Sequence, residues 1–385
     1  MHSLYVTTPA GTADLAAEEL AACGVTEVKV ERGGVACVGT LEQAYRACLW
    51  SRVANRVLLK LGEFPAPTPE ALYDGVRSID WSEHLTVDGT LAVDATSTSS
   101  AITHTQFAAL KTKDAIVDQF RERTGARPSV DVDAPHVRIN LHLDRDVATL
   151  AIDLSGESLH RRGYRGAQGA APLKENLAAA ILLRAGWQKL VSAGDDGELG
   201  FVDPMCGSGS LAIEAALIAG DVAPGLLRND FGFLRWRGHD EAVWQRLLTE
   251  AAERRAAARS GRVVLRAYDR DPAAVRATLD NAVRAGFAKH LHAERRELAD
   301  LPAAPVARGL VAVNPPYGER LDEEDLRITY SALAETCRRF KGWRAGFLVG
   351  NPLLEEVFFH AVGRPRIKKP LANANLRAYF YLYDL

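Results

Sequence analysis

The stretch from Phe201 to Ser210, FVDPMCGSGS, constrains this chain more than any other. Its apolar residues predict a buried strand, its glycines predict a tight turn, and the alanine-rich run Leu211–Ala219 predicts a helix that starts at once. Gly207 and Gly209 remove side chains where a ligand has to approach the backbone, and the helix start offers free N–H groups. The sequence therefore predicts a ligand-binding loop between a strand and a helix.

Asp203 ends the predicted strand and places a carboxylate beside the turn. An anion at this position favours a cationic or amine-bearing ligand over a pyrophosphate. The spacing also lacks the GxGxxG dinucleotide pattern and the GxxxxGK[ST] phosphate loop, which argues against NAD and ATP.

A second stretch, Leu310–Arg320 with the sequence LVAVNPPYGER, predicts another buried strand that stops at Asn314. Pro315 and Pro316 follow it, and two successive prolines forbid both helix and ladder pairing. Such a rigid turn fixes the direction of the side chains beside it. A plain turn between strand and helix is the competing interpretation.

Together, DPMCGSG and NPPYGERL resemble the cofactor loop and the catalytic loop of S-adenosyl-L-methionine-dependent methyltransferases that modify exocyclic amines of nucleobases. Within that group the chain is similar to the THUMP-containing guanine-N2 RNA methyltransferases, particularly the large-subunit (23S) rRNA branch, over nearly its whole length. The resemblance implies S-adenosyl-L-methionine as cofactor and 23S rRNA as partner. It also implies an α/β fold, a Rossmann-like class I methyltransferase with a seven-stranded sheet preceded by ferredoxin-like and THUMP modules.

The resemblance also implies roles for single residues. Asp269 ends the strand predicted at Val263–Ala267, where a carboxylate suits ribose hydroxyls. Asp300 lies where this family's adenine-recognising acid or amide would sit, although a loop acid without a role is an equal alternative. The predicted catalytic residues are Asn314, Pro315, Pro316 and Tyr317, and the predicted cofactor-binding residues are Asp203, Pro204, Cys206, Gly207, Ser208, Gly209, Asp269, Asp300 and Asn314. No metal site is expected.

The predicted chemistry starts from an exocyclic amine whose lone pair is delocalised into the base. The Asn314 side-chain carbonyl and a backbone carbonyl of the Pro315–Pro316 turn can accept the two amine hydrogens and direct the lone pair at the methyl group. Tyr317 can stack on the base. No strong general base is required, so most of the catalysis is orientation and electrostatics.

The amino-terminal half predicts two small α/β modules. Residues 1–64 alternate in the order β-α-β-β-α-β with a hairpin at Gly33–Gly34, which is typical of a ferredoxin-like unit. Residues 65–157 begin with a proline-rich connection and hold the place of the THUMP RNA-binding domain. Residues 158–171 are then a linker, and residues 172–385 are the methyltransferase domain.

Basic residues in two segments are candidates for RNA binding. Lys111 and Lys113 lie on a predicted helix, where they could equally be its solvated side. The others lie in the loop Ser158–Gly166, whose arginines fit phosphates and whose Tyr164 can stack on a base, unless the arginines pair with carboxylates. The candidates are Lys111, Lys113, Arg161, Arg162 and Arg165.

About forty residues, Asp221–Gly261, separate the cofactor loop from the next strand and depart from the minimal methyltransferase fold. They include an aromatic cluster of Phe231, Phe233 and Trp236 and a charged helix. The large-subunit rRNA branch carries a similar insert, while a packed surface helix is the plainer interpretation.

The composition limits the remaining choices. At 385 residues the chain exceeds one ordinary core, and its net charge of −2 means that any basic surface is local. Five scattered cysteines and the absence of a leader or apolar span favour a cytoplasmic protein, away from membranes, and we expect a monomer. The alternatives are a tRNA guanine-N2 methyltransferase, an adenine-N6 DNA methyltransferase, and an RNA-binding or chaperone protein that has kept only the fold.

Overall fold

The computed structural model describes residues 1–166, 173–193, 197–258, 263–317, 322–373 and 376–385. They form two compact units. The first unit comprises residues 1–8, 16–159 and 229–248, and the second comprises residues 9–15, 160–228 and 249–385. Residues 318–321 of the NPPYGERL motif and residues 167–171 of the predicted linker lie outside the described residues. Among those described, no helix combines the length and the apolar character that crossing a bilayer requires.

The first 65 residues have the predicted β-α-β-β-α-β order. The elements are β1 (His2–Thr7), α1 (Ala13–Ala22), β2 (Thr26–Glu31), β3 (Gly34–Gly39), α2 (Leu41–Trp50) and β4 (Arg56–Pro65). Gly33 has a φ of +93° in the turn between β2 and β3, as the hairpin prediction requires. Helix α2 begins where the Thr40 hydroxyl and the Gln43 side chain form a capping box.

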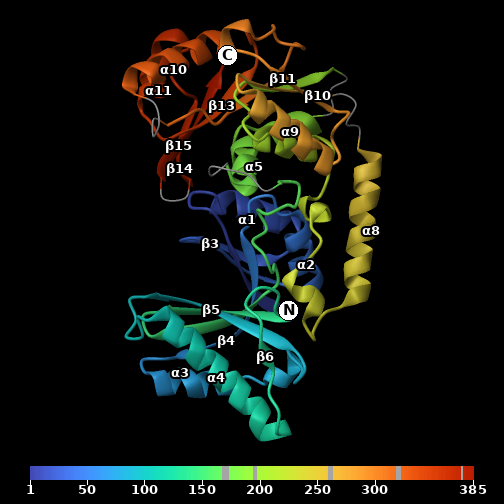
Figure 1. Cartoon of the computed structure of the whole chain (residues 1–385), viewed down its shortest axis with the longest axis vertical. Helices are drawn as coiled ribbons and strands as arrows, with labels where there is room; N and C mark the ends of the chain where they lie inside the picture. The colour runs from blue at the N-terminus through green and yellow to red at the C-terminus, as the bar shows by residue number, and fades with distance from the viewer. Residues whose placement is uncertain (167–172, 194–196, 259–262, 318–321, 374–375) are drawn as a thin grey trace. The chain divides into compact units, whose positions relative to one another are not determined.

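The next module continues the same sheet. Its elements are α3 (Pro69–Arg77), η1 (Trp81–Glu83), β5 (Thr90–Thr98), α4 (Thr105–Thr124), β6 (Ser129–Val130), β7 (Val137–Asp144) and β8 (Val147–Asp153). Strand β4 pairs with β1 on one side and with β8 on the other, up to the pair Pro65 and Val147. The strand order is β2-β3-β1-β4-β8-β7-β5-β6. Helices α3 and α4 pack together beside it (Figure 1).

Part of the insert belongs to the first unit. Its short helix η3 (Gly232–Arg235) and the start of α8 (Glu241–Ala257) pack there through aromatic side chains. The ring of Phe233 stacks on Tyr45 of α2 with 4.1 Å between centroids, and Trp244 meets Phe233 edge-on. A Cβ on Gly232 would lie 2.4 Å from the Asp153 carbonyl oxygen, so only glycine allows this close approach. The aromatic residues of the insert are therefore core residues.

The second unit is the predicted doubly wound domain. Its elements are α5 (Glu175–Arg184), α6 (Trp187–Ser192), β9 (Leu199–Asp203), α7 (Ser210–Ala219), η2 (Pro224–Leu227), β10 (Val263–Asp269), α9 (Pro272–Arg284), β11 (Leu291–Arg295), η5 (Leu298–Asp300), β12 (Gly309–Val313), α10 (Glu323–Cys337), β13 (Arg344–Val349), α11 (Leu353–Ala361), β14 (Ile367–Asn373) and β15 (Leu376–Asp384). Within the described residues the sheet has the order β11-β10-β9-β12-β13-β15-β14, which confirms the seven-stranded prediction.

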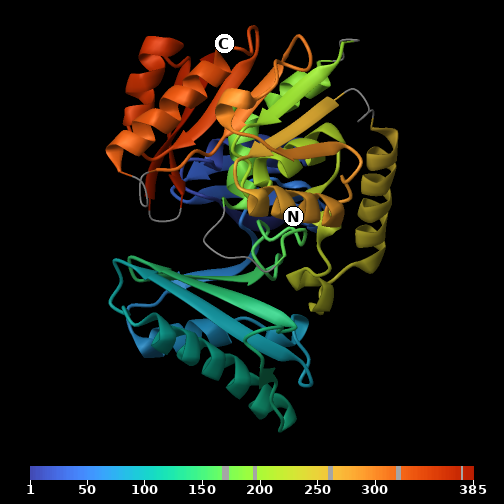
Figure 2. The same ribbon diagram turned by 45° about the horizontal axis from the view of Figure 1, so that its top comes forward.

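Two apolar layers enclose this sheet. Helices α5, α7 and α9 cover one face, and α10 and α11 cover the other (Figure 2). The strands from β11 to β13 are parallel, whereas β15 and β14 run antiparallel at one end. Strand β14 was not predicted, because Lys368, Lys369 and Pro370 are exposed on this edge strand and give no apolar pattern.

Candidate functional site

The two predicted loops leave the sheet at its topological switch point. Strands β9 and β12 are parallel neighbours, with Val202 beside Val311, although they are not successive in the chain. The glycine loop follows β9 and the Asn-Pro-Pro-Tyr turn follows β12. Since parallel strands end at one edge, both loops meet there, and in open α/β sheets ligands bind at such a crevice.

The two glycines of the first loop serve different needs. Both have positive φ, +52° at Gly207 and +82° at Gly209. A Cβ on Gly209 would lie 2.8 Å from the side chain of Thr278, so this glycine lets α9 pack closely. A Cβ on Gly207 would meet nothing within 4 Å. Gly207 therefore leaves the open backbone that a ligand needs.

Two carboxylates, Asp203 and Asp269, accept hydrogen bonds from backbone N–H groups of the glycine loop. Asp269 Oδ2 accepts a hydrogen bond from the Gly207 N–H at 2.9 Å, and its Oδ1 accepts one from Asp271 at 3.0 Å. Asp203 is 1% exposed and accepts from the Met205 N–H at 3.2 Å. Burial, with the charge of Asp269 adding to it, raises the pKa of Asp203 well above its ordinary value. A cationic ligand group beside Asp203 would offset that cost.

Sequence reasoning missed two residues that brace the same loop from α9. The Thr278 hydroxyl donates to the Gly207 carbonyl at 3.0 Å, and Asn281 Nδ2 donates to the Ser208 carbonyl at 2.9 Å. Both side chains are fully buried. Polar residues three positions apart on the inner face of an amphipathic helix were the available signal.

Three residues predicted to face RNA lie inside the second unit instead. Arg162 is 1% exposed, with its Nε 3.5 Å from the buried Glu214 carboxylate, and Tyr164 donates to the same Oε1 at 3.3 Å. Arg165 donates to Ser210 Oγ at 2.7 Å and to the Leu173 carbonyl at 2.8 Å. The RNA-binding prediction is therefore wrong for Arg162, and Tyr164 has no surface for a base.

Arg165 instead ties the start of α7 to the residues before α5. Its Nε lies 3.6 Å from the Glu175 carboxylate, in addition to the contacts with Ser210 and Leu173. Because Ser210 follows Gly209 directly, the guanidinium fixes the end of the glycine loop. These contacts do not fit a phosphate-binding role for Arg165.

The other basic candidates lie nearer the surface. Arg161 is exposed, and its carbonyl accepts a hydrogen bond from Arg228 at 2.8 Å. Lys111 and Lys113 on α4 are half-buried. The Lys111 ammonium lies 4.8 Å from the Tyr73 ring centroid, and Lys113 forms an ion pair with Asp114. An RNA-binding role for these three remains a prediction.

The Asn-Pro-Pro-Tyr turn is ordered by its own side chains and by its neighbours. The Tyr317 hydroxyl donates to Asn314 Oδ1 at 2.6 Å, so the predicted amine acceptor already accepts one hydrogen bond. The Tyr330 hydroxyl donates to the Pro316 carbonyl at 2.6 Å. Of the two proline carbonyls, Pro315 is therefore the better candidate to accept from a substrate amine.

The remaining cofactor candidates line the same edge of the sheet. Pro204 and Cys206 are buried, and Ser208 is half-buried with its hydroxyl 3.5 Å from Ser210 Oγ. Burial raises the pKa of the Cys206 thiol, so the thiol stays protonated and packs as a neutral side chain rather than acting as a nucleophile. Asp300 is exposed at the end of η5, beyond β11.

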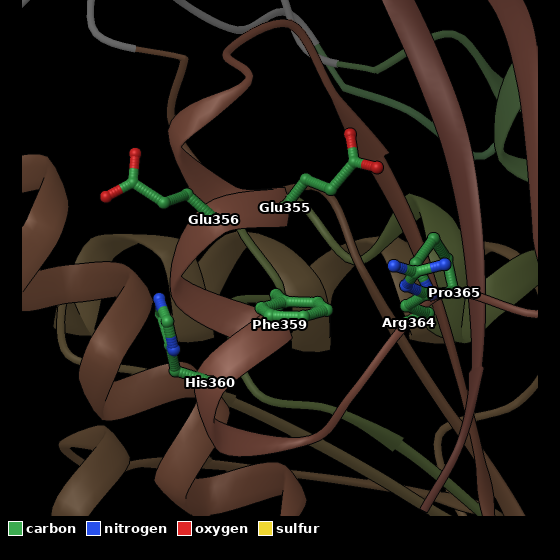
Figure 3. A pocket seen from close by; sticks show the side chains of 6 residues that line it. All are labelled: Glu355, Glu356, Phe359, His360, Arg364 and Pro365. Atoms are coloured by element: carbon green, nitrogen blue, oxygen red, sulfur yellow. The ribbon is translucent and has the colours of Figure 1, made fainter.

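A hollow of about 530 Å³ elsewhere on the second unit contains none of these residues. Its lining residues are Glu355, Glu356, Phe359, His360, Arg364 and Pro365, on α11 and the segment after it (Figure 3). Glu356 pairs with Arg327 at 2.9 Å, and the Arg364 guanidinium lies 5.8 Å from the Phe359 ring centroid. The hollow is open to solvent, and the charged side chains of Glu356 and Arg364 already have partners. We therefore do not favour it as the reactive site.

Family models match three successive parts of the chain. Residues 3–58 match the RlmL ferredoxin-like domain, and residues 66–153 match the THUMP domain. Residues 162–374, more than half of the chain, match the RMKL-like methyltransferase domain.

Curated relatives and solved structures cover the chain almost from end to end. Ribosomal RNA large subunit methyltransferase K/L of Methylococcus capsulatus is 51% identical over 99% of this chain. The chain spans about half the length of the curated relatives it matches, 51% in this case.

Two crystal structures are 32% identical to the chain. SMU.472, solved as a complex with SAH, has a TM-score of 0.86 and is covered over 98% of its length, with 100% of this chain covered. A Listeria monocytogenes protein described as a predicted N6-adenine-specific DNA methylase has a TM-score of 0.84, with 99% of this chain and 96% of that chain covered.

Proposed function

The chain belongs to the RMKL-like methyltransferase family, and on this premise we propose that it transfers a methyl group from S-adenosyl-L-methionine to N2 of a guanine in 23S rRNA. The observation that carries the proposal is the meeting of two loops at the switch point of the sheet. The glycine loop follows β9 there, and Asn314–Tyr317 follow the neighbouring β12.

The residues of the first loop fit the cofactor. The open backbone at Gly207 leaves space for a ligand. A cationic ligand group would stabilise the charged form of the buried Asp203. Asp269 holds the loop through the Gly207 N–H, and its carboxylate suits ribose hydroxyls. The complex of SMU.472 with SAH supports this choice. Bound S-adenosyl-L-methionine supplies an electrophilic methyl group on a sulfonium.

The second loop prepares the nucleophile. Asn314 Oδ1 and the Pro315 carbonyl accept the two hydrogens of the amine, which directs its lone pair away from the base plane. Asn314 Oδ1 has two lone pairs, so it can accept from the amine while it keeps the 2.6 Å hydrogen bond from the Tyr317 hydroxyl. The ring of Tyr317 is then the surface on which we expect the base to stack. The new N–CH3 bond forms as the S–CH3 bond breaks and S-adenosylhomocysteine leaves. The nitrogen is then positively charged and acidic, so its proton passes to water and no strong base is needed.

The choice of guanine in rRNA rests on the relatives and on the amino-terminal half. The curated relatives carry the name of large-subunit rRNA enzymes, and the THUMP domain favours RNA over DNA. A cytoplasmic monomer is the form in which we expect this activity. The name of the Listeria neighbour supports adenine N6 in DNA as the second candidate, because both bases present a conjugated amine to the same motif.

Labelled methyl transfer to total RNA from a strain that lacks the gene tests the proposal. We expect label in the 23S pool, absence of label from 16S and tRNA, and N2-methylguanosine after digestion and mass spectrometry. The Asn314→Ala variant should bind the cofactor and transfer no label. Label confined to tRNA would reject the rRNA substrate, and N6-methyladenosine as the product would reject guanine.

A further inference from the structure

Residues of α10 and of the end of β13 hold the Asn-Pro-Pro-Tyr turn from outside its own sequence. Tyr330 on α10 is 0% exposed and directs its hydroxyl at the Pro316 carbonyl, 2.6 Å away. Burial raises the pKa of Tyr330 to about 12, so the phenol stays a neutral donor at physiological pH. Its ring packs among apolar residues of the α10 and α11 layer. The buried Tyr330 hydroxyl thus holds the Pro316 carbonyl in a fixed position.

The residues after β13 support Tyr317. Asn351 Nδ2 donates to the Tyr317 carbonyl at 3.4 Å, while its Oδ1 accepts from the N–H of Leu353, the first residue of α11, at 3.0 Å. The Tyr317 ring lies against Gly350, where a Cβ would come within 3.1 Å of two ring carbons. Asn351 and Gly350 therefore set the position of Tyr317 relative to the sheet.

These contacts bear on orientation, the main source of catalysis in the proposed reaction. The acceptors for a target amine are the Asn314 side chain and the Pro315 carbonyl. They belong to the same turn as the supported carbonyls of Pro316 and Tyr317. A displacement of about 1 Å in such a site can lower the rate by roughly 100-fold. A turn of two prolines has few N–H groups of its own with which to fix itself.

We propose that Tyr330 and Asn351 are positioning residues for methyl transfer, which hold the carbonyls of Pro316 and Tyr317 so that Asn314 and Pro315 face the target amine. This inference rests on the proposed function. Neither residue contacts the substrate in it, and both act through the turn.

The central experiment compares two buried tyrosines of the same apolar layer. Tyr330→Phe removes the hydroxyl that supports Pro316. Tyr383→Phe is the matched control, because the Tyr383 hydroxyl finds no hydrogen-bond partner among the described residues and Tyr383 is 1% exposed. We expect Tyr330→Phe to lower kcat by about 10-fold at an unchanged cofactor Kd and KM, and Tyr383→Phe to leave all three unchanged.

Asn351 needs a variant that keeps the hydrogen bond to the first residue of α11. Asn351→Asp retains the acceptor for the Leu353 N–H and removes the donor to the Tyr317 carbonyl. We expect a kcat several-fold below that of the wild type, with the melting temperature within about 2 °C. Asn351→Ala should lose both the rate and part of the stability.

Hydrogen–deuterium exchange supplies a readout that does not depend on activity. In cofactor-free protein, Tyr330→Phe and Asn351→Asp should raise exchange in the peptide that contains Asn314 and Tyr317, and Tyr383→Phe should not. Unchanged exchange in this peptide, or equal kcat for Tyr330→Phe and Tyr383→Phe, would overturn the positioning role. A wild-type protein that methylates no RNA would instead reject the proposed function, while the exchange result would still decide whether the turn is held as inferred.

Discussion

At the scale of single residues, two effects can be distinguished at Gly207: the space that a ligand needs and the strain that a side chain would cause in the backbone. Its positive φ disfavours any side chain, yet nothing in the described protein would contact a Cβ there. We predict that Gly207→Ala weakens S-adenosyl-L-methionine binding by at least about 10-fold, because the methyl group enters the space beside the loop. Calorimetry on the purified variant measures this.

Gly125 provides the control for Gly207. It caps α4 with a φ of +75°, and a Cβ there would also meet nothing within 4 Å. Gly125→Ala should therefore carry the same backbone strain, about 1 to 2 kcal/mol, with normal cofactor binding. Equal affinity for the cofactor in the two variants would show that the Gly207 side of the loop is not the pocket.

Asp203 links cofactor binding to pH. Because burial raises its pKa in the folded state, the folded protein holds this proton more tightly than the unfolded chain does. The stability contribution of Asp203 therefore falls as the pH rises from its usual 3.8 toward the raised value. We predict that cofactor-free Asp203→Asn is more stable than the wild type at pH 8, and that this advantage shrinks toward pH 5.

Thermal unfolding over that pH range measures the Asp203 effect, and calorimetry should show weaker cofactor binding by the Asn variant. A stability difference that is independent of pH would mean that Asp203 does not titrate with folding.

At the scale of elements, the segment before α5 is fastened to α7 through a buried ion pair. Arg162 and Glu214 are 1% and 0% exposed, and Tyr164 shares the same carboxylate. We predict that Arg162→Ala lowers the free energy of unfolding by about 3 to 5 kcal/mol, because it leaves the Glu214 charge buried without its cation. Denaturant unfolding provides the measurement.

The neighbouring arginine is the control. Arg161 is exposed, so Arg161→Ala should change the stability by no more than about 0.5 kcal/mol. If both alanine variants unfolded at the same denaturant concentration, the buried pair would have no structural role.

At the scale of the whole molecule, the choice of RNA must come from surfaces beyond the reactive turn. Lys111, Lys113 and Arg161 are the predicted contacts that remain compatible with their positions. We predict that changing all three to Gln weakens RNA binding and flattens its salt dependence by about 0.7 to 0.9 units of log–log slope per lost phosphate contact. Affinity measured across a salt series checks this.

The control replaces three exposed cations outside the predicted set. The side chains of Lys29, Arg145 and Arg338 are 76%, 82% and 58% exposed, and their change to Gln alters the net charge equally. An equal loss of slope in the two triple variants would assign the effect to total charge alone. Cofactor binding should survive in both.

The sequence was a good guide wherever neighbouring residues decide the structure. The strand, glycine turn and helix around Asp203 and Gly207 occur as predicted, as do the strand and rigid turn at Asn314, because backbone preferences act over a few residues. The same local logic predicted the Gly33 hairpin. These patterns, with the order of the elements, determined the fold class.

Only the tertiary structure decided which distant side chains complete each local motif. The sequence shows that Arg162 is basic, but its exposure depends on Glu214, 52 residues away, and the support of Pro316 by Tyr330 depends on how α10 packs on the sheet. The aromatic residues of the insert are likewise visible in the sequence, but only the tertiary structure shows that Phe233 packs against Tyr45. A residue's type fixes the bonds that it can form, and burial by segments far along the chain selects the ones that it does form.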